Sequence, residues 1–315
     1  MTQREAASVE TAPAPAGVTP ERVAPRTLEP LPEDVNPVGV YMTPKHAYYL
    51  NGDGPVPSVT TVLEIIDKPG IGVFKAKEAA RAVYQVDRVT PRVADLTEED
   101  AIKWALKEAD KARDAAGDLG SAVHLLADLV GNAPQGQETV STGFGVDEST
   151  YPYIEAYRGF LDRYSASSIV SSEHAVWSLK GYAGTYDFLM NIRCGKCGHC
   201  LLGTECFSPE LWLIDIKTSG KGPYPEWGLQ LAGYRWADYI VLPGDPTLYP
   251  MPEIQRAGVL HLRPDLYPDT GWRLIEYPIT KALDYTAFLS ALDLWRWRNS
   301  KRFTKSRLLG ATPKE

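Results

Sequence analysis

Two aspartates and a lysine interrupt stretches that otherwise have the apolar character of buried strands. Asp215 and Lys217 lie two residues apart in LWLIDIKTSG, residues 211–220, and Asp187 lies in AGTYDFLMNI, residues 183–192. Alternation along a strand places Asp215 and Lys217 on one face. If the two strands pair, the two carboxylates converge, and their repulsion then requires a proton or a cation between them.

Carboxylate oxygens in such a pair suit Mg²⁺ or Mn²⁺, which retain waters and take further ligands from a phosphate. A lysine beside the metal can orient the attacking water or stabilise the charge that builds on phosphorus. The three residues therefore indicate metal-assisted hydrolysis of a phosphodiester. The alternative is an ordinary ion pair on an edge strand, which would have no chemical role.

The elements that must position these residues can be predicted from composition and period. Residues 168–179, 182–192 and 211–219 are rich in β-branched and aromatic residues and predict consecutive strands, with two later strands at 257–264 and 272–279. Helices are expected on both sides of this block, at 74–85, from Thr97 to a break at Gly117–Gly120, at 121–130, 151–164, 226–240 and 285–303. This order predicts an α/β (α+β) fold in which helices flank a central mixed sheet.

Composition limits the organisation and the partners. Residues 1–37 are rich in Pro, Ala and Glu and predict a disordered leader, whereas 38–315 can form a single domain. The net charge of −7 argues against holding nucleic acid by bulk electrostatics, although it excludes neither local basic groups nor acidic groups masked by a metal. Neither a membrane-spanning run nor a signal peptide is recognisable, so we expect a cytoplasmic protein without a membrane partner.

Five short segments occur in an order that resembles a known enzyme superfamily. They are GSAVH (120–124), SEH (172–174), GTYD (184–187), IDIK (214–217) and QLAGY (230–234). This order resembles the PD-(D/E)xK nucleases, and among them the RecB-like exonuclease branch of phage recombination exonucleases and CRISPR-associated relatives. The resemblance covers roughly residues 45–240, including PSVTTVL, which is similar to the N-terminal region of phage members. It implies a restriction-endonuclease-like core and a metal-dependent DNase that usually acts from DNA ends.

The resemblance also implies a role for individual residues. Asp187 and Asp215 would be metal-binding carboxylates, Lys217 the catalytic lysine, and the backbone carbonyl of Ile216 a further metal ligand. His124 matches the histidine that joins the metal ligands in this branch. Without the resemblance, a lone histidine beside two leucines on a helix would be interpreted as a core residue.

Three more residues have weaker assignments. Glu173 stands where related enzymes often have a glutamate, and would support the metal ligands or act as an occasional ligand, but it could equally face solvent. Gln230 and Tyr234 are four residues apart and share one helical face. The resemblance implies that they contact DNA or the active-site lysine, whereas the alternative is ordinary packing of an amphipathic helix.

All four cysteines of the chain fall in one short segment, residues 194–206. A C-x2-C pair followed by two further thiols suits tetrahedral zinc, and the glycines between them permit tight turns. The C-x2-C-x2-C spacing also resembles iron–sulfur ligation. We favour a structural Zn²⁺ over an iron–sulfur cluster, in a metal-binding hairpin inserted in the nuclease core and held by Cys194, Cys197, Cys200 and Cys206.

The C-terminal segment 284–307 is expected to form a basic helix with interleaved tryptophans. Arg296, Arg298 and Arg302 could contact phosphates, as could Lys221 just beyond the Asp215 strand. The alternative is a final helix that buries its aromatic residues and solvates its charges.

The leading functional hypothesis is a Mg²⁺- or Mn²⁺-dependent DNA exonuclease of recombination or repair, virus-encoded and acting in a bacterial host. An endonuclease with the same core and a non-catalytic DNA-binding module with a zinc hairpin are the alternatives. DNA with free ends is the expected partner, with an annealing protein or helicase as a candidate protein partner. The intact set of Asp187, Asp215 and Lys217 argues against the non-catalytic alternative.

Overall fold

The computed structural model describes most of the chain between Val40 and Ser300. Its described residues are 40–42, 48–50, 53–85, 96–131, 147–164, 169–192, 209–218, 220–242 and 247–300. The predicted leader at 1–37, the cysteine segment 194–206, Arg302 and the rest of 301–307 lie outside them. Among the described helices, none is both long and apolar enough to cross a membrane.

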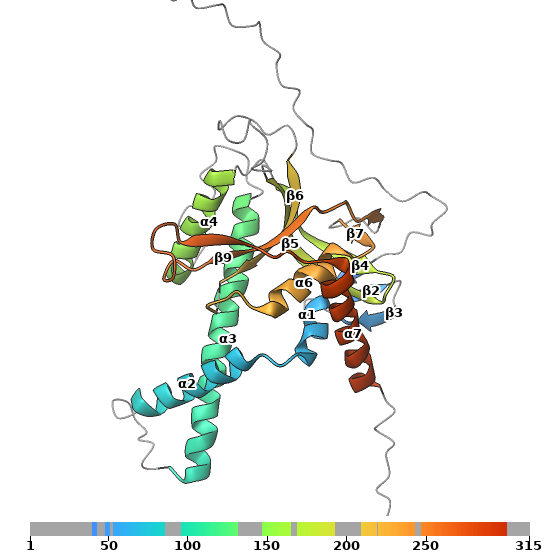
Figure 1. The fold of residues 1–315 in the computed structure, drawn as a ribbon. Coiled ribbons are helices and arrows are strands. Elements are labelled where there is room, and N and C mark those ends of the chain that lie inside the picture. The colour runs from blue at the N-terminus through green and yellow to red at the C-terminus, as the bar shows by residue number, and fades with distance from the viewer. Residues whose placement is uncertain are drawn as a thin grey trace, which may run out of the picture.

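A seven-stranded mixed sheet forms the centre of the molecule (Figure 1). Strands β6 and β9 pair in parallel, whereas the other neighbours in the sheet are antiparallel. In spatial order the strands are β10 (Trp272–Glu276), β9 (Arg256–Leu262), β6 (Glu210–Lys217), β5 (Tyr182–Ile192), β4 (Ile169–Ser178), β7 (Tyr239–Val241) and β8 (Leu248–Pro250). The predicted central mixed sheet is therefore confirmed.

Helices cover both faces of this sheet. They are α1 (Val59–Val62), α2 (Pro69–Gln85), α3 (Glu98–Gly131), α4 (Tyr151–Tyr164), α6 (Pro225–Arg235) and α7 (Thr286–Asn299), the last preceded by a π-helical turn, Lys281–Tyr285. A core on one face packs α1, α6 and α7 against the sheet, and a second core on the other face packs α3 and α4. The predicted arrangement of helices flanking the sheet is thus also confirmed.

Strand β6 shows why its sequence is apolar on both sides. Leu211 and Leu213 belong to the core with α6 and α7, whereas Trp212, Ile214 and Ile216 belong to the core with α3 and α4. A strand buried on both faces reads as a continuous hydrophobic run. Asp215 and Lys217 therefore stand out in this strand as polar residues on the face of α6.

The longest helix differs from its prediction. The expected break at Gly117–Gly120 was wrong, because α3 continues without interruption from Glu98 to Gly131. A helical glycine costs about 1 kcal/mol relative to alanine. Packing of the C-terminal half of α3 on the sheet, where Val123 and Ala127 are buried, outweighs that cost. The helix start was predicted correctly, since Thr97 Oγ1 accepts a hydrogen bond from the backbone N–H of Asp100.

The helix expected at 226–240 is also shorter than predicted. It ends at Arg235, and Tyr239–Val241 instead forms β7, which pairs with β4. The backbone N–H groups of Trp236 and Ala237 close the last turn of α6 by bonding to carbonyls within that helix. The apolar residues that follow form a strand of the sheet. In the sequence, such a short apolar run cannot be distinguished from a further turn of helix.

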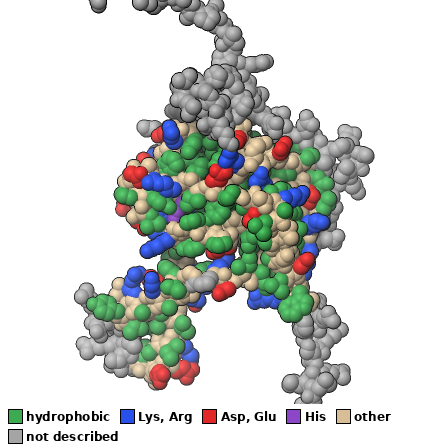
Figure 2. Space-filling model, in the orientation of Figure 1, with side chains coloured by type: hydrophobic (Ala, Val, Ile, Leu, Met, Phe, Trp, Pro, Cys, Tyr) green, Lys and Arg blue, Asp and Glu red, His purple; other side chains and the backbone are tan. Residues whose placement is uncertain are grey.

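Two groups of elements lie apart from the main sheet. A small antiparallel sheet contains β1 (Val40–Met42), β2 (Tyr48–Leu50) and β3 (Asp53–Val56). Helix α2 and the N-terminal half of α3 pack together and project away from the sheet (Figure 1). Figure 2 shows this projection as a separate lobe with apolar side chains on its surface between basic and acidic groups.

Candidate functional site

The site forms where β5 and β6 stop pairing with each other. Their antiparallel register runs only as far as Phe188 opposite Ile214, although both strands continue beyond that pair. Beyond this pair, the backbone N–H of Ile216 donates its hydrogen bond to the carboxylate of Asp187 instead of to a carbonyl of β5. Strand separation thus opens a gap in the sheet, and one carboxylate both satisfies the exposed backbone and faces the gap.

Helix α3 brings His124 to this carboxylate. Its Nδ1 lies 3.2 Å from Asp187 Oδ1. Burial alone would lower the pKa of His124, but the charge of Asp187 and their hydrogen bond outweigh it and raise that pKa to about 9. Lost hydration alone would raise the pKa of Asp187, but the charge and hydrogen bond of His124, followed by Lys217 and the Ile216 N–H, lower it. In this state His124 and Asp187 form an ion pair.

Glycine at position 120 lets α3 approach β6 this closely. A Cβ atom at Gly120 would lie 3.3 Å from Thr218 Oγ1, which is closer than most side-chain contacts. His124 follows one helical turn later, on the same side of α3. The GS segment that precedes the histidine therefore has a packing role.

Strand β4 contributes Glu173 in an unusual backbone conformation. Its φ of 51° is in the left-handed region, which is uncommon for residues other than glycine. Its neighbours Ser172 and His174 pair with Phe188 and Tyr186, so Glu173 lies opposite Asp187. Lost hydration and then the charge of Asp187 raise the pKa of Glu173 to about 8. Such strain concentrates at functional sites.

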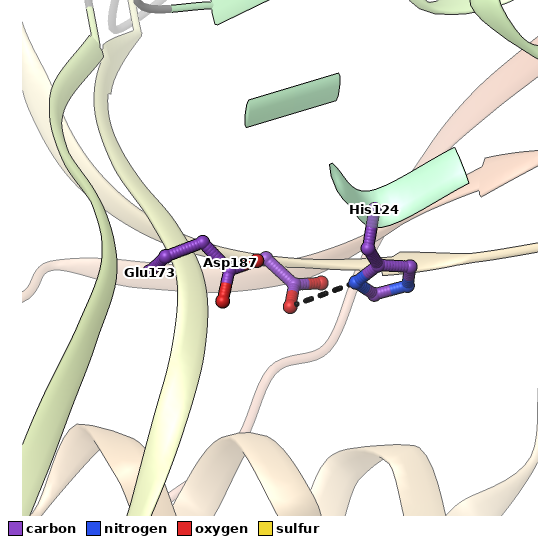
Figure 3. A group of neighbouring side chains, drawn as sticks. All are labelled: His124, Glu173 and Asp187. Atoms are coloured by element: carbon purple, nitrogen blue, oxygen red, sulfur yellow. Dashed lines mark ion pairs between the residues drawn. The ribbon is translucent and has the colours of Figure 1, made fainter. Parts of the chain in front are cut away.

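Three of these side chains form a group with the dimensions of a metal site. One ligand atom each from His124, Glu173 and Asp187 can be chosen so that all lie within 4.8 Å of one another. Figure 3 shows Asp187 between the other two, with Glu173 entering from β4 and His124 from α3. Two carboxylates and an imidazole are a donor set that suits a divalent cation such as Mn²⁺, and the carboxylates also suit Mg²⁺.

Asp215 and Lys217 lie beside this group and touch each other. The Lys217 Nζ atom is 2.5 Å from Asp215 Oδ2, and only 3% of the Asp215 surface is exposed. Burial first, and then the nearby Asp187, raise the pKa of Asp215 to about 6 in spite of Lys217. The two aspartates therefore differ in proton affinity, as expected for two carboxylates close enough for their charges to interact.

Helix α6 supports Asp215 from the other side. Gln230 Nε2 donates to Asp215 Oδ1 at 2.9 Å and to the Tyr234 hydroxyl at 3.2 Å. Tyr234 is buried, and desolvation, followed by the charge of Asp215, raises its pKa well above the usual value. Gln230 and Tyr234 thus form a chain of hydrogen bonds that ends at the carboxylate rather than at the lysine.

Two residues of this region were not predicted from the sequence. Asp128, one turn after His124 on α3, accepts a hydrogen bond of 2.6 Å from Ser172 Oγ on β4. Both line the narrow cavity that also contacts His124, Glu173 and Asp187. The spacing of Asp128 from His124 by four residues was the available signal, because it places both on one helical face.

Of the basic residues expected to bind DNA, Arg302 lies outside the described residues, and the three others do not join this group. Arg296 on α7 donates hydrogen bonds to the backbone carbonyls of Lys180 and Gly181 in the β4–β5 turn. Arg298 is exposed near the end of the same helix, and Lys221 is exposed just after β6. DNA contact by these residues stays a prediction, as does metal binding by the four cysteines.

Comparison with models of known protein families and with curated proteins finds no match for this chain. The chemistry of the site is set by its side chains. Six of them meet at one opening in the sheet: His124, Glu173, Asp187, Asp215, Lys217 and Gln230. A cation held by the carboxylates, with an ammonium group beside it, can polarise a phosphodiester and activate water.

Proposed function

We propose that this protein is a nuclease that uses Mg²⁺ or Mn²⁺ to hydrolyse phosphodiester bonds of DNA, as an exonuclease acting from ends. The observation that carries the proposal is the ion pair of Lys217 and the buried Asp215, directly beside the His124, Glu173 and Asp187 group. An edge-strand ion pair without a chemical role would not require this second group of ligands. The exonuclease mode follows from the resemblance described above.

The proposed metal ligands are the side chains of His124, Glu173, Asp187 and Asp215, with the backbone carbonyl of Ile216. When bound, the cation would supply positive charge against the phosphate oxygens and lower the pKa of a coordinated water. The fit of a metal rests on the 4.8 Å grouping of His124, Glu173 and Asp187. It is supported by burial and by the negative charge of Asp187, which raise the pKa of Glu173 and of Asp215 even though cationic side chains lie nearby.

The other residues hold and balance this centre. The Lys217 ammonium is placed by Asp215 and can stabilise the negative charge that develops on the phosphate or on the attacking water. Gln230 fixes the Asp215 oxygen that Lys217 does not contact. Asp187 receives the Ile216 N–H and orients His124, so its position is determined from two sides.

The test is hydrolysis of linear and covalently closed circular duplex DNA with Mg²⁺, Mn²⁺ or EDTA. Metal-dependent loss of the linear form alone is expected, and Lys217→Ala should reduce the rate by about a hundredfold or more. Lys281→Ala, an exposed lysine beside α7, is the matched control and should keep full activity. Cleavage of both DNA forms would indicate an endonuclease. Binding without cleavage under any metal would overturn the enzyme proposal.

A further inference from the structure

A second cavity, larger than the one at the metal ligands, opens beside the end of β6. Its volume is about 440 Å³, within the range of roughly 300 to 1,000 Å³ typical of pockets for small organic ligands. Ala116 and Leu119 of α3 form one side, Pro152 and Tyr153 of α4 form another, and Pro264 comes from the turn after β9. Thr218 and the Arg263–Asp265 pair complete the lining.

This cavity adjoins the proposed catalytic centre. Thr218, in its wall, directly follows Lys217 in the chain. Leu119, which lines the cavity from α3, precedes His124 by five residues, which is about 7.5 Å along a helix. A group in the cavity would therefore lie next to whatever occupies the metal site, with the Gly120–Thr218 contact between them.

The lining offers little to a phosphate and much to a flat apolar group. The Arg263 guanidinium is already held by Asp265 through two contacts, Nε to Oδ1 at 2.7 Å and Nη2 to Oδ2 at 2.5 Å. It also donates to the backbone carbonyl of Gly220. The pair is neutral overall, and apart from Thr218 the remaining lining residues are aliphatic or aromatic. Aromatic side chains of this kind bind nucleobases by stacking, with little sequence preference.

We infer that this cavity holds the base of the nucleotide next to the scissile phosphate. The inference rests on the proposed nuclease function and deepens it, because a base can enter the cavity only when it is not paired. The substrate strand is therefore single-stranded, or frayed, at the point of cleavage. Tyr153 provides the stacking surface, and Ala116 and Leu119 provide the opposite wall.

A substitution that fills the cavity tests this inference without removing a core residue. Ala116 is exposed on α3 and lines the cavity, so Ala116→Trp should obstruct it while the helix stays intact. Ala115 is equally exposed on the same helix but is not part of the lining, which makes Ala115→Trp the matched control. Circular dichroism and thermal unfolding of both variants check the fold.

The measurement is anisotropy of fluorescein-labelled single-stranded oligonucleotides with Mn²⁺, using Lys217→Ala protein to prevent cleavage. One oligonucleotide is intact, and the other carries abasic residues throughout. We expect Ala116→Trp to weaken binding of the intact oligonucleotide about tenfold and to leave the abasic one unchanged. Ala115→Trp should bind both oligonucleotides as tightly as the parent protein, which carries Lys217→Ala alone.

The outcomes separate the two proposals. Equal affinity of the parent protein for intact and abasic oligonucleotides would overturn the base-binding inference, even when wild-type protein hydrolyses DNA. An equal loss of affinity for both oligonucleotides in Ala116→Trp would also overturn it, because a bulky residue would then obstruct only the backbone. Absence of both hydrolysis and binding by wild-type protein would overturn the nuclease proposal and this inference together.

Discussion

Glu173 combines a strained backbone with a carboxyl group that holds its proton near neutral pH. A left-handed conformation costs a residue with a side chain about 1 kcal/mol or more. Lost hydration, and then the charge of Asp187 opposite it, raise the pKa of the Glu173 carboxyl group to about 8. Both features lower the stability of the metal-free protein. A bound cation would reverse the effect of the neighbouring carboxyl groups, because its positive charge stabilises the ionised forms of both Glu173 and Asp187.

Glu173→Gly should therefore separate stability from function. Glycine adopts a φ of 51° without strain, so we expect the free energy of unfolding in EDTA to rise by about 1 kcal/mol. Hydrolysis should fall at least tenfold, because a ligand is lost. Urea unfolding and DNA hydrolysis measure the two effects. Glu173→Ala is the control, since it loses the carboxylate and keeps the strain, and equal stability of the two variants would contradict the argument.

The protonation of His124 and Glu173 also predicts how metal affinity depends on pH. Their pKa values of about 9 and about 8 mean that both hold a proton at pH 7, and both must lose it to bind a cation. Mn²⁺ affinity should thus rise from pH 7 to pH 9, with up to two protons released per ion. Calorimetry in buffers of different ionisation enthalpy counts these protons. Glu173→Gln should release one fewer, and an affinity independent of pH would contradict the ligand assignment.

At the scale of elements, α3 connects the parts of the site. The one helix carries Ala116 and Leu119 at the second cavity, His124 at the metal ligands, and Asp128 at its contact with β4. Its distance from β6 is set where Gly120 meets Thr218. A small shift of this helix would move every one of these groups relative to the sheet.

Two glycines of α3 should respond differently to substitution. A Cβ atom at Gly117 would meet nothing within 4 Å, so Gly117→Ala should raise the free energy of unfolding by about 0.5 to 1 kcal/mol with activity unchanged. Gly120→Val would press α3 away from Thr218 and should reduce hydrolysis about tenfold, since small displacements of catalytic groups are costly. Unfolding curves and rates of the two variants test this, and full activity in Gly120→Val would refute it.

The elements that sequence predicts well are those with a clear local period. Strands β4, β5 and β6 were expected within a few residues of their observed bounds, because their β-branched and aromatic residues are buried on the sheet. The sequence did not predict that α3 is continuous. The helix is held together by tertiary packing around Val123, and the two glycines, Gly117 and Gly120, carry no sign of that packing in the sequence. The start of β7 after α6 was also not predicted, because it depends on pairing with β4.

Several residues of the candidate site could be proposed from the sequence, but the hydrogen bonds and backbone conformations that join them could not. Polar residues in apolar strands identified Asp187 and Asp215 directly, since burial of a charge needs a reason. The hydrogen bond from the Ile216 N–H to Asp187 could not be foreseen, because it depends on where two strands stop pairing. The left-handed conformation of Glu173 and its position opposite Asp187 likewise depend on strand register.

At the scale of the whole molecule, the charge balance opposes DNA binding unless a metal is present. The chain has a net charge of −7, and the proposed site brings three carboxylates, of which Asp215 is buried, to the place where the phosphate must approach. The arginines that could attract DNA are partly engaged, as with Arg296 at the β4–β5 turn. Metal binding would reverse the local charge without changing the rest of the surface.

DNA binding should therefore depend on a divalent cation. We expect Lys217→Ala protein to bind a labelled single-stranded oligonucleotide at least tenfold more tightly in Mn²⁺ than in EDTA at equal ionic strength. Fluorescence anisotropy measures both affinities. Asp187→Asn combined with Lys217→Ala should lose most of the gain from Mn²⁺. Tight binding in EDTA would show that basic surface groups, rather than the metal site, attract the DNA.

The most direct test of the central claim is the rate at which wild-type protein and Asp187→Asn release nucleotides from end-labelled linear DNA in Mn²⁺. Asparagine keeps the size of the side chain and an oxygen that can accept the Ile216 N–H, so the fold should persist. We expect metal-dependent release by the wild type and at least about a hundredfold slower release by Asp187→Asn. Equal rates, or no release by the wild type with either Mn²⁺ or Mg²⁺, would contradict it.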